Sequence, residues 1–345
     1  MSPAADEAEE APPPRITDAL YGHADAEAAL LAAYRGGRVP HAFLLIGPKG
    51  IGKATLAYRM ARFVLADPDP TAPEVQAATS LAVDPEHPVA RRMAAQAQAD
   101  LLVIERTVNE KGNLRQQIAV DDVRRTVSFF GATAAGEGGW RVAIIDAVDE
   151  LNRSGANALL KVLEEPPQRA LLLLVCHSAA RVPATLRSRC RIVALRPLAQ
   201  TEVAAALGAA VGRASSDPQI QAAAAAAEGS VGRALTFLDE GALALRQRAL
   251  DQLDRLPALD SNALHGLGEA LAGTDPQPLA AFVDTVNAWL SQRLHRNQGE
   301  IGRVVRLAEA WERINQAARD AETYNLERKP LVFSVFGLLA EATRG

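Results

Sequence analysis

Cysteine is scarce in this sequence, and its scarcity excludes two ways of building a small stable domain. The 345 residues include two cysteines, Cys176 and Cys190, and neither belongs to a C-x-x-C pair. A disulfide framework needs more thiols at regular spacing, and a structural zinc site commonly needs four side-chain ligands. We therefore expect reduced thiols and neither zinc nor another structural metal.

Long apolar runs are also missing. No run approaches the roughly 18–20 residues that a membrane-spanning helix needs. The first residues, MSPAADEAEEAPPP, are acidic and proline-rich, whereas a signal peptide is basic and then apolar. These features predict a cytoplasmic protein with no membrane partner, and residues 1–15 are expected to form a disordered acidic tail.

Net charge is small and unevenly placed. Four acidic side chains within residues 6–10 account for the formal charge of −4, which leaves 37 acidic and 37 basic side chains in the rest of the chain. A neutral body does not bind nucleic acid by net charge alone. Lysine occurs five times, and two of these residues, Lys49 and Lys53, lie within residues 47–55.

Short apolar runs alternate with helical patterns as far as Pro197. The runs cover residues 42–46, 101–104, 142–145 and 171–175. Such alternation predicts an α/β fold with a parallel sheet and flanking helices. Residues 67–99 are polar, rich in proline and alanine, and show little periodicity, so they are interpreted as a surface insertion. Beyond Pro197 helical periodicity continues to the end, with an interruption near residue 248.

The stretch GPKGIGKAT at residues 47–55 matches the phosphate-binding loop pattern except at one position. Gly47, Gly50 and Gly52 would let backbone N–H groups approach a phosphate, and Lys53 would neutralise its charge. The position that should supply a hydroxyl to magnesium is Ala54. Because the loop lies between an apolar run and a helical pattern, a chance match is disfavoured.

The apolar run VAIID ends at Asp146, the position from which an acidic residue usually serves a phosphate-binding loop. The next residue should be a glutamate that orients the attacking water, and it is Ala147. Asp149 and Glu150 lie further on, where a helix would turn their side chains elsewhere. Without that carboxylate, the general-base contribution of roughly 10²–10⁴ in rate is lost. Nucleotide binding is therefore expected to survive better than hydrolysis.

Five arginines follow the last apolar run within sixteen residues: Arg181, Arg187, Arg189, Arg191 and Arg196. Two interpretations stay open on this pattern alone. One is a solvated basic face; the other is a guanidinium offered to the γ-phosphate of a neighbouring subunit, since arginine has a permanent charge and a fixed fork.

Several motifs occur in the order found in one family. They are LYGH at residues 20–23, GRVPHAFLLIGPKGIGK at 37–53, VAIIDAVDELN at 142–152, NALLKVLEEPP at 157–167, Ser188-Arg189-Cys190, and GSVGRAL at 229–235. Together they resemble the AAA+ clamp-loader subunits of bacterial DNA polymerase III, over residues 20 to about 240. In that family, motor subunits (gamma and tau) carry a Thr after the loop lysine, an Asp-Glu pair at the strand end and four zinc-binding cysteines. Ala54, Ala147 and the retained Arg189 favour the non-motor, delta-prime kind.

The resemblance implies a domain plan and a set of functional residues. Residues 16–197 would form an AAA+ nucleotide-fold domain, 198–248 a small helical lid, and 249–345 a helical collar for oligomerisation. Arg189, with Ser188 and Cys190, would act in trans as an arginine finger. A degenerate site that binds ATP or ADP weakly would consist of Gly47, Gly50, Gly52, Lys53, Thr55, Asp146 and Arg233.

The same resemblance implies partners and leaves alternatives. The chain would assemble with gamma/tau and delta subunits and act on the sliding clamp and primer-template DNA through that complex, with little or no ATPase activity of its own. The alternative within the family is a hydrolysing motor subunit, in which water replaces the missing hydroxyl and another acid replaces the missing carboxylate. A P-loop kinase or helicase loader is a more distant alternative, because neither explains the Ser-Arg-Cys triplet after NALLKVLEEPP.

Overall fold

The computed structural model describes residues 12–37, 39–108, 115, 117–131, 139–273, 275–296, 300–324 and 326–344. Most of the expected acidic tail, residues 1–11, lies outside this part of the chain. The chain divides into two compact units, Met1–Gly232 and Arg233–Gly345. Each unit has its own hydrophobic core.

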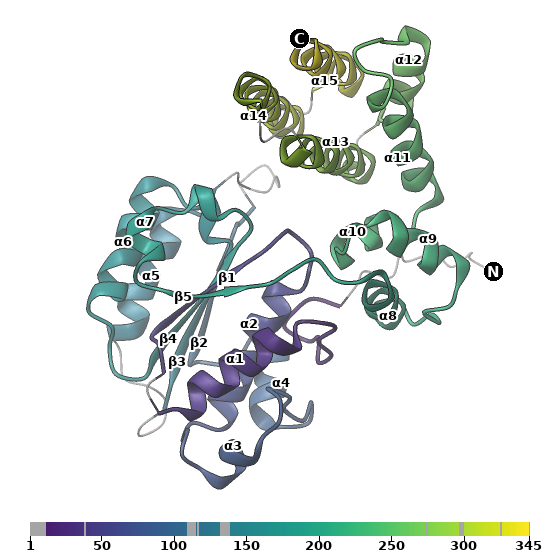
Figure 1. The fold of residues 1–345 in the computed structure, drawn as a ribbon. Helices are drawn as coiled ribbons and strands as arrows, with labels where there is room; N and C mark the ends of the chain where they lie inside the picture. Colours follow the sequence, from purple (N-terminus) through teal and green to yellow (C-terminus); the bar gives the residue numbers. More distant parts are fainter. Residues whose placement is uncertain are drawn as a thin grey trace, which may run out of the picture. The chain divides into compact units, whose positions relative to one another are not determined.

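The first unit is built on a parallel sheet of five strands in the order β2-β3-β4-β1-β5 (Figure 1). The strands are β1 (Ala42–Ile46), β2 (Leu101–Glu105), β3 (Arg141–Asp146), β4 (Ala170–Cys176) and β5 (Arg191–Ala194). The first four coincide with the apolar runs, so the predicted parallel sheet is confirmed. The sequence analysis missed β5, because this edge strand buries only Val193 and carries the periodicity of neither a buried strand nor a helix.

Helices cover both faces of the sheet (Figure 1). They are α1 (Ala24–Arg35) and α2 (Lys53–Ala66) on one face, and α5 (Val120–Gly131) and α6 (Arg153–Glu164) on the other. Alternate side chains of β1 show the division: Phe43 and Leu45 belong to the core under α1 and α2, whereas Leu44 belongs to the core under α5 and α6. This three-layer arrangement is the predicted α/β fold with flanking helices.

Residues 67–99 are more ordered than the surface insertion that their composition suggests. They contain α3 (Pro73–Ala77) and α4 (Pro88–Ala94), each with a proline at its first position, where the missing N–H costs nothing. Val75, Leu81 and Met93 are buried in the core under α1 and α2. The helices are too short for periodicity to reveal, and the apolar residues that hold the segment are widely spaced.

Residues 198–232 add α8 (Gln200–Ala210), α9 (Pro218–Ala226) and the start of α10 (Val231–Thr236) to the first unit. The predicted boundary at residue 248 falls within α11 (Glu240–Leu253), and the division into lid and collar stays a prediction. The described part of the chain from residue 198 onward contains helices and no strand, as the periodicity indicates.

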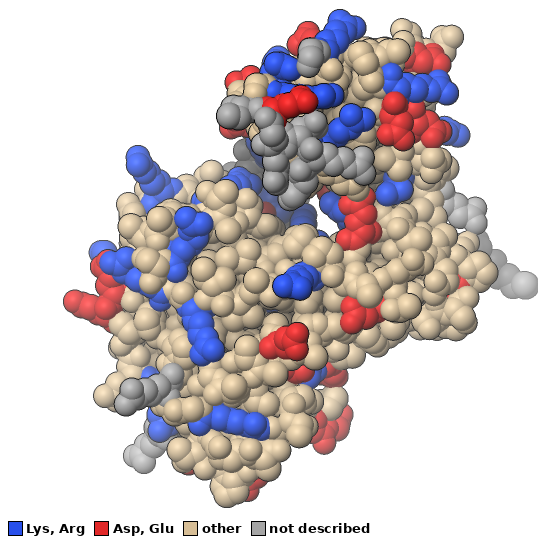
Figure 2. All heavy atoms as spheres, viewed as in Figure 1, with Lys and Arg blue, Asp and Glu red and all other residues tan. Residues whose placement is uncertain are grey.

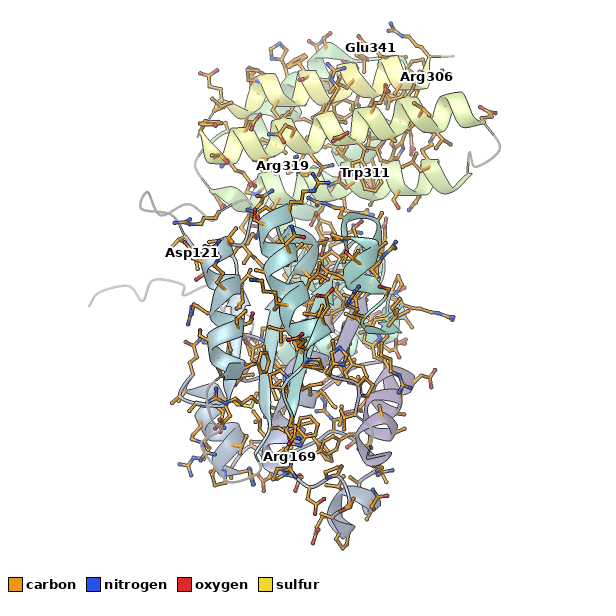
Figure 3. All side chains as sticks on the ribbon, turned by 90° about the vertical axis from the view of Figure 1, so that its left-hand side faces the viewer. Asp121, Arg169, Arg306, Trp311, Arg319 and Glu341 are labelled. Atoms are coloured by element: carbon orange, nitrogen blue, oxygen red, sulfur yellow. The ribbon has the colours of Figure 1, made fainter. Side chains whose placement is uncertain are left out.

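The second unit packs its helices around one core. They are α11, α12 (Ser261–Ala270), α13 (Pro276–Arg296), α14 (Ile301–Thr323) and α15 (Arg328–Thr343). Phe282 and Phe336 are fully buried there, and Trp311 of α14, labelled in Figure 3, packs against the same core. Asn287 of α13 and Asn315 of α14 exchange two amide hydrogen bonds of 3.0 Å, which satisfies polar groups at the helix contact.

Candidate functional site: the phosphate-type loop and the Ser-Arg-Cys turn

The glycine-rich loop connects the carboxyl end of β1 to the first residue of α2. Gly50 and Gly52 have φ angles of 76° and 102°, which other residues rarely adopt, and Gly52 is the N-cap of α2. The N–H of Gly47 donates to the carbonyl of Cys176 in β4 at 3.2 Å. Strand, loop and helix N-terminus therefore stand in the order that a phosphate-binding loop requires.

Lys53 is turned into this loop. Its side chain is buried, and its Nζ donates to the carbonyl oxygen of Gly47 at 2.7 Å and also to that of Pro48. Burial lowers the pKa of Lys53 to about 8, against the opposing effect of the carboxylates of Asp146 and Asp149. A compact ammonium group thus stands at the N-terminus of α2, where an anion would be bound.

The two positions that lack an oxygen follow Lys53 at the start of α2 and Asp146 at the end of β3. Ala54 and Thr55 are half-buried in the first turn of α2, and Ala147 is buried in the core under α1 and α2. Asp146 at the end of β3 has a raised pKa because of burial, which Lys53 opposes. Asp146 also borders a cavity of about 460 Å³, which is lined mainly by β2 and by residues 13–15 and 93–98. The site retains the glycine backbone of the loop and the lysine, but it has no hydroxyl at position 54 and no carboxylate at position 147.

The sequence analysis expected the side chain of Asp149 to point away from the site, and it does not. The 3₁₀ turn Val148–Glu150 folds back over β4, and Asp149 accepts hydrogen bonds from the backbone N–H groups of His177 and Ser178 at 2.8 and 3.1 Å. A 3₁₀ turn directs its side chains differently from the α-helix assumed from the sequence. Glu150, the other acid considered, pairs with Arg106 at 2.8 Å. The carboxylates of Asp149 and Glu150 are thus both engaged in contacts within the chain.

Two histidines near the loop were not singled out from the sequence. A ring nitrogen of His23, Nε2, lies 2.7 Å from the carbonyl of Ile51 in the loop. His177 follows β4 directly, and burial together with Lys53 lowers its pKa to about 4. Its Nδ1 is buried and has no partner among the described residues. The usable signal was the position of His177 at the carboxyl end of a central strand, where ligands of open α/β sheets bind.

The segment GSVG at residues 229–232 lies against the other side of the loop. The hydroxyl of Ser230 donates to the carbonyl of Lys49 at 2.9 Å, and the N–H of Gly232 donates to that of Gly50 at 3.0 Å. The sequence analysis assigned a role in nucleotide binding to Arg233 of this motif, and that role stays a prediction. Arg233 continues α10 as the first residue of the second unit.

The Ser-Arg-Cys triplet closes the short helix α7 (Ala184–Arg187) by returning hydrogen bonds to its carbonyls. Ser188 Oγ and Arg189 Nη1 both donate to Thr185, at 3.1 and 2.9 Å, and Cys190 Sγ donates to Leu186 at 3.2 Å. The last carbonyls of a helix lack partners within the helix, so the triplet acts as a C-terminal cap. Arg189 remains partly exposed.

Arg189 and the glycine-rich loop occupy opposite ends of neighbouring strands. β5 begins two residues after Arg189, and its first residue, Arg191, pairs with Phe43 in β1, whereas the loop begins at Gly47. Four residues at about 3.3 Å each place these ends at least roughly 13 Å apart along the strands. Arg169, labelled in Figure 3, immediately precedes β4 and so marks the amino ends of the strands. The structure therefore brings together the loop, Lys53 and Asp146, and keeps the Ser-Arg-Cys turn apart from them.

The surface around this turn is basic. Lys and Arg side chains gather over α6 and α7 in Figure 2. Arg181 and Arg191, which flank the turn, are exposed. Among the described residues, no group of three or more His, Cys, Asp or Glu side chains could hold a metal ion. No helix in the described ranges is long and apolar enough to cross a membrane.

Comparison with known proteins gives a consistent set of relatives. A family model described as "DNA polymerase III, delta subunit" matches residues 22–199, slightly more than half of the chain. The DNA polymerase III subunit delta' of Pseudomonas aeruginosa is 37% identical over 157 residues, which are 45% of this chain and 43% of that protein. The subunit gamma/tau of Mycobacterium tuberculosis is 28% identical over 286 residues, covering 76% of this chain and 46% of that protein.

Solved structures include one that spans most of the chain. A DNA polymerase III gamma subunit-related protein from Thermotoga maritima covers 91% of this chain and 100% of its own, with a TM-score of 0.45 and 16% identity. The matches to the two relatives named above each cover less than half of the relative's length.

Proposed function

The chain belongs to the DNA polymerase III delta-subunit family, and from this we propose that it is a clamp-loader subunit of the delta-prime kind. In this proposal it is a largely non-hydrolysing stator. It supplies Arg189 to the nucleotide held by a neighbouring motor subunit and thereby helps to load the sliding clamp on primed DNA during replication.

The observation that carries this proposal is the separation of Arg189 from the chain's own loop. Arg189 lies near the amino end of β5, and the loop lies at the carboxyl end of β1. A guanidinium at one end of the sheet cannot serve a phosphate at the other end of the same sheet. This separation supports a role toward a partner's phosphate, and an arginine supplied in trans is worth roughly 10³–10⁵ in kcat.

The loop itself fits a phosphate better than a magnesium–nucleotide complex. The helix N-terminus and the buried ammonium group of Lys53 favour an anion. Ala54 and Ala147 supply no oxygen, so the metal and the attacking water would lack the ligands that hydrolysis requires. We propose that Gly47, Gly50, Gly52, Lys53, Thr55, Asp146 and Arg233 bind ATP or ADP weakly.

The proposed partners follow from the relatives. Proteins named gamma/tau and delta' subunits of DNA polymerase III are similar to this chain over part of its length, so gamma/tau and delta subunits are the expected neighbours. The sliding clamp and primer-template DNA would be contacted through the complex, in the cytoplasm. Residues 16–197, 198–248 and 249–345 would act as nucleotide-fold domain, lid and collar.

The test is a reconstituted loader containing Arg189→Ala. We expect ATP turnover by the complex, stimulated by clamp and primed DNA, to fall by at least tenfold, and clamp loading to fall with it. Arg191→Ala is the matched control, because Arg191 is an exposed arginine two residues away. Rates unchanged by Arg189→Ala would refute the arginine-finger role.

A further inference from the structure

Arg189 is held by α6 as well as by α7, the helix that ends just before it. Its Nη2 lies 2.9 Å from Oε1 of Glu164, the last residue of α6, and its Nη1 donates to the Thr185 carbonyl at 2.9 Å. The two contacts come from α6 and α7, which pack against each other. They fix the guanidinium at two of its three nitrogens, and so define its plane as well as its position.

The ion pair is poorly suited to stabilising the fold. The side chains of Arg189 and Glu164 are 36% and 50% exposed, and exposed pairs of this kind contribute little to folding. An orienting role fits the geometry better, because the pair restricts a long side chain that otherwise samples many rotamers. Ordering such a side chain on binding costs about two- to tenfold in the corresponding equilibrium or rate.

The pair also leaves the guanidinium able to bind an anion. Arginine has five N–H groups, and the contacts with Glu164 and Thr185 occupy two of them. Three remain for oxygen atoms of a phosphate, so Arg189 can engage a neighbour without releasing its anchors. Glu164 therefore need not compete with the phosphate for the same N–H groups.

We propose that Glu164 is a positioning residue that holds Arg189 ready for a neighbouring subunit's phosphate. This inference rests on the proposed function of Arg189. Glu164 touches no reacting atom; it acts through the guanidinium, and its contribution is made before the neighbour's nucleotide reacts.

The chain offers two matched variants for the test. Glu164→Gln keeps an oxygen that can accept the Nη2 hydrogen bond and removes the charge, whereas Glu164→Ala removes both. Glu165→Ala is the control, because the adjacent Glu165 is exposed and its carboxylate has no ion pair or hydrogen bond among the described residues. Thermal unfolding of each variant establishes that the chain still folds.

The experiment measures kcat and KM for ATP in the reconstituted loader, with each variant made in the Arg189 and the Arg189→Ala backgrounds. We expect Glu164→Ala to lower kcat about two- to tenfold with little change in KM, and Glu164→Gln to retain at least half of the rate. Glu165→Ala should match the unaltered chain. In the Arg189→Ala background, Glu164→Ala should not lower kcat further, because Glu164 affects the reaction only by positioning the Arg189 guanidinium.

The outcomes separate the two ideas. If Arg189→Ala lowers the rate and Glu164→Ala does not, the positioning role is wrong and the arginine finger stands. A loss from Glu164→Ala that persists in the Arg189→Ala background also overturns the positioning role. If Arg189→Ala itself changes nothing, the proposed function fails, and the role of Glu164 fails with it.

Discussion

The backbones of Gly50 and Gly232 are in direct contact, although they are far apart in the sequence. The adjacent residues Lys49 and Ser230, which also form a hydrogen bond, are 181 positions apart. The N–H of Gly232 donates to the Gly50 carbonyl at 3.0 Å, and a Cβ on either glycine would come within 3.0 Å of the other's Cα. The shape of the phosphate-type loop therefore depends on a segment that the chain supplies after the sheet is complete. Residues 229–232 are part of the loop's support.

Gly50→Ala should destabilise the first unit through this contact. The new Cβ would lie 2.5 Å from the Ser230 hydroxyl, and an alanine at positive φ costs about 1–2 kcal/mol by itself. Gly37→Ala is the control, since Gly37 has a similar φ of 71° and a Cβ there would meet nothing within 4 Å. We expect urea unfolding to show a loss about 1–3 kcal/mol larger for Gly50→Ala. Equal losses would mean that the contact with residues 229–232 adds nothing.

Asp149→Ala should lower the free energy of unfolding, because it leaves two backbone N–H donors without an acceptor. The N–H groups of His177 and Ser178, two half-buried residues just after β4, would lose their acceptor, and an unsatisfied donor costs up to about 1–3 kcal/mol when water cannot reach it. Asp149→Asn keeps one oxygen and should cost less. Asp121→Ala is the control, because Asp121 is an exposed residue of α5 whose pair with Arg124 contributes little (Figure 3). A loss no larger than that of Asp121→Ala would contradict the prediction.

The isolated chain should turn over ATP no faster than background. Asp149 is the nearest candidate for the missing base, but both of its oxygens already accept backbone N–H groups. Ala54→Thr should make nucleotide binding more dependent on Mg²⁺, since it restores a metal ligand, without producing turnover. Phosphate release by the purified chain and by this variant checks both statements. Turnover well above background would favour the hydrolysing motor subunit instead.

The sequence predicted the parts of the fold that depend on one strong pattern. The four strands β1 to β4, the glycine-rich loop and the helical C-terminal part all follow from local periodicity or spacing. The family inferred from the order of motifs is confirmed by the family match. Edge strand β5 was missed because tertiary pairing with β1, and not its own pattern, makes it a strand.

The site was predicted less completely than the fold, for a physical reason. Asp149 and Ser230 act through hydrogen bonds to backbone groups far away in the sequence, and no local pattern records those partners. Glu164 belongs to the motif NALLKVLEEPP that the sequence analysis used, but nothing in that motif distinguishes Glu164 from Glu165. The distinction comes from packing of α6 against α7, which brings one of the two carboxylates to Arg189.

Anion binding by the loop should weaken as pH rises through about 8. Burial lowers the pKa of Lys53 from its ordinary 10.5 to about 8. At pH 9 the side chain is therefore mostly an uncharged amine, and the ammonium group that a phosphate needs is largely lost. A pKa of 8 leaves about nine-tenths of the lysine protonated at pH 7 and about one-tenth at pH 9, which predicts roughly tenfold weaker binding. Titration with a fluorescent ADP analogue between pH 7 and pH 9 measures this change.

The titration of Lys53 does not itself destabilise the fold over this range, because its stability linkage has the opposite sign. Between pH 8 and 10.5 the unfolded chain binds more protons at this lysine than the folded chain does, so this group makes folding more favourable as pH rises. Lys53→Met should bind the analogue weakly at every pH, whereas Lys49→Ala should keep the step near pH 8. A step that persists in Lys53→Met would assign the titration to another group and remove the ammonium of Lys53 from the binding site.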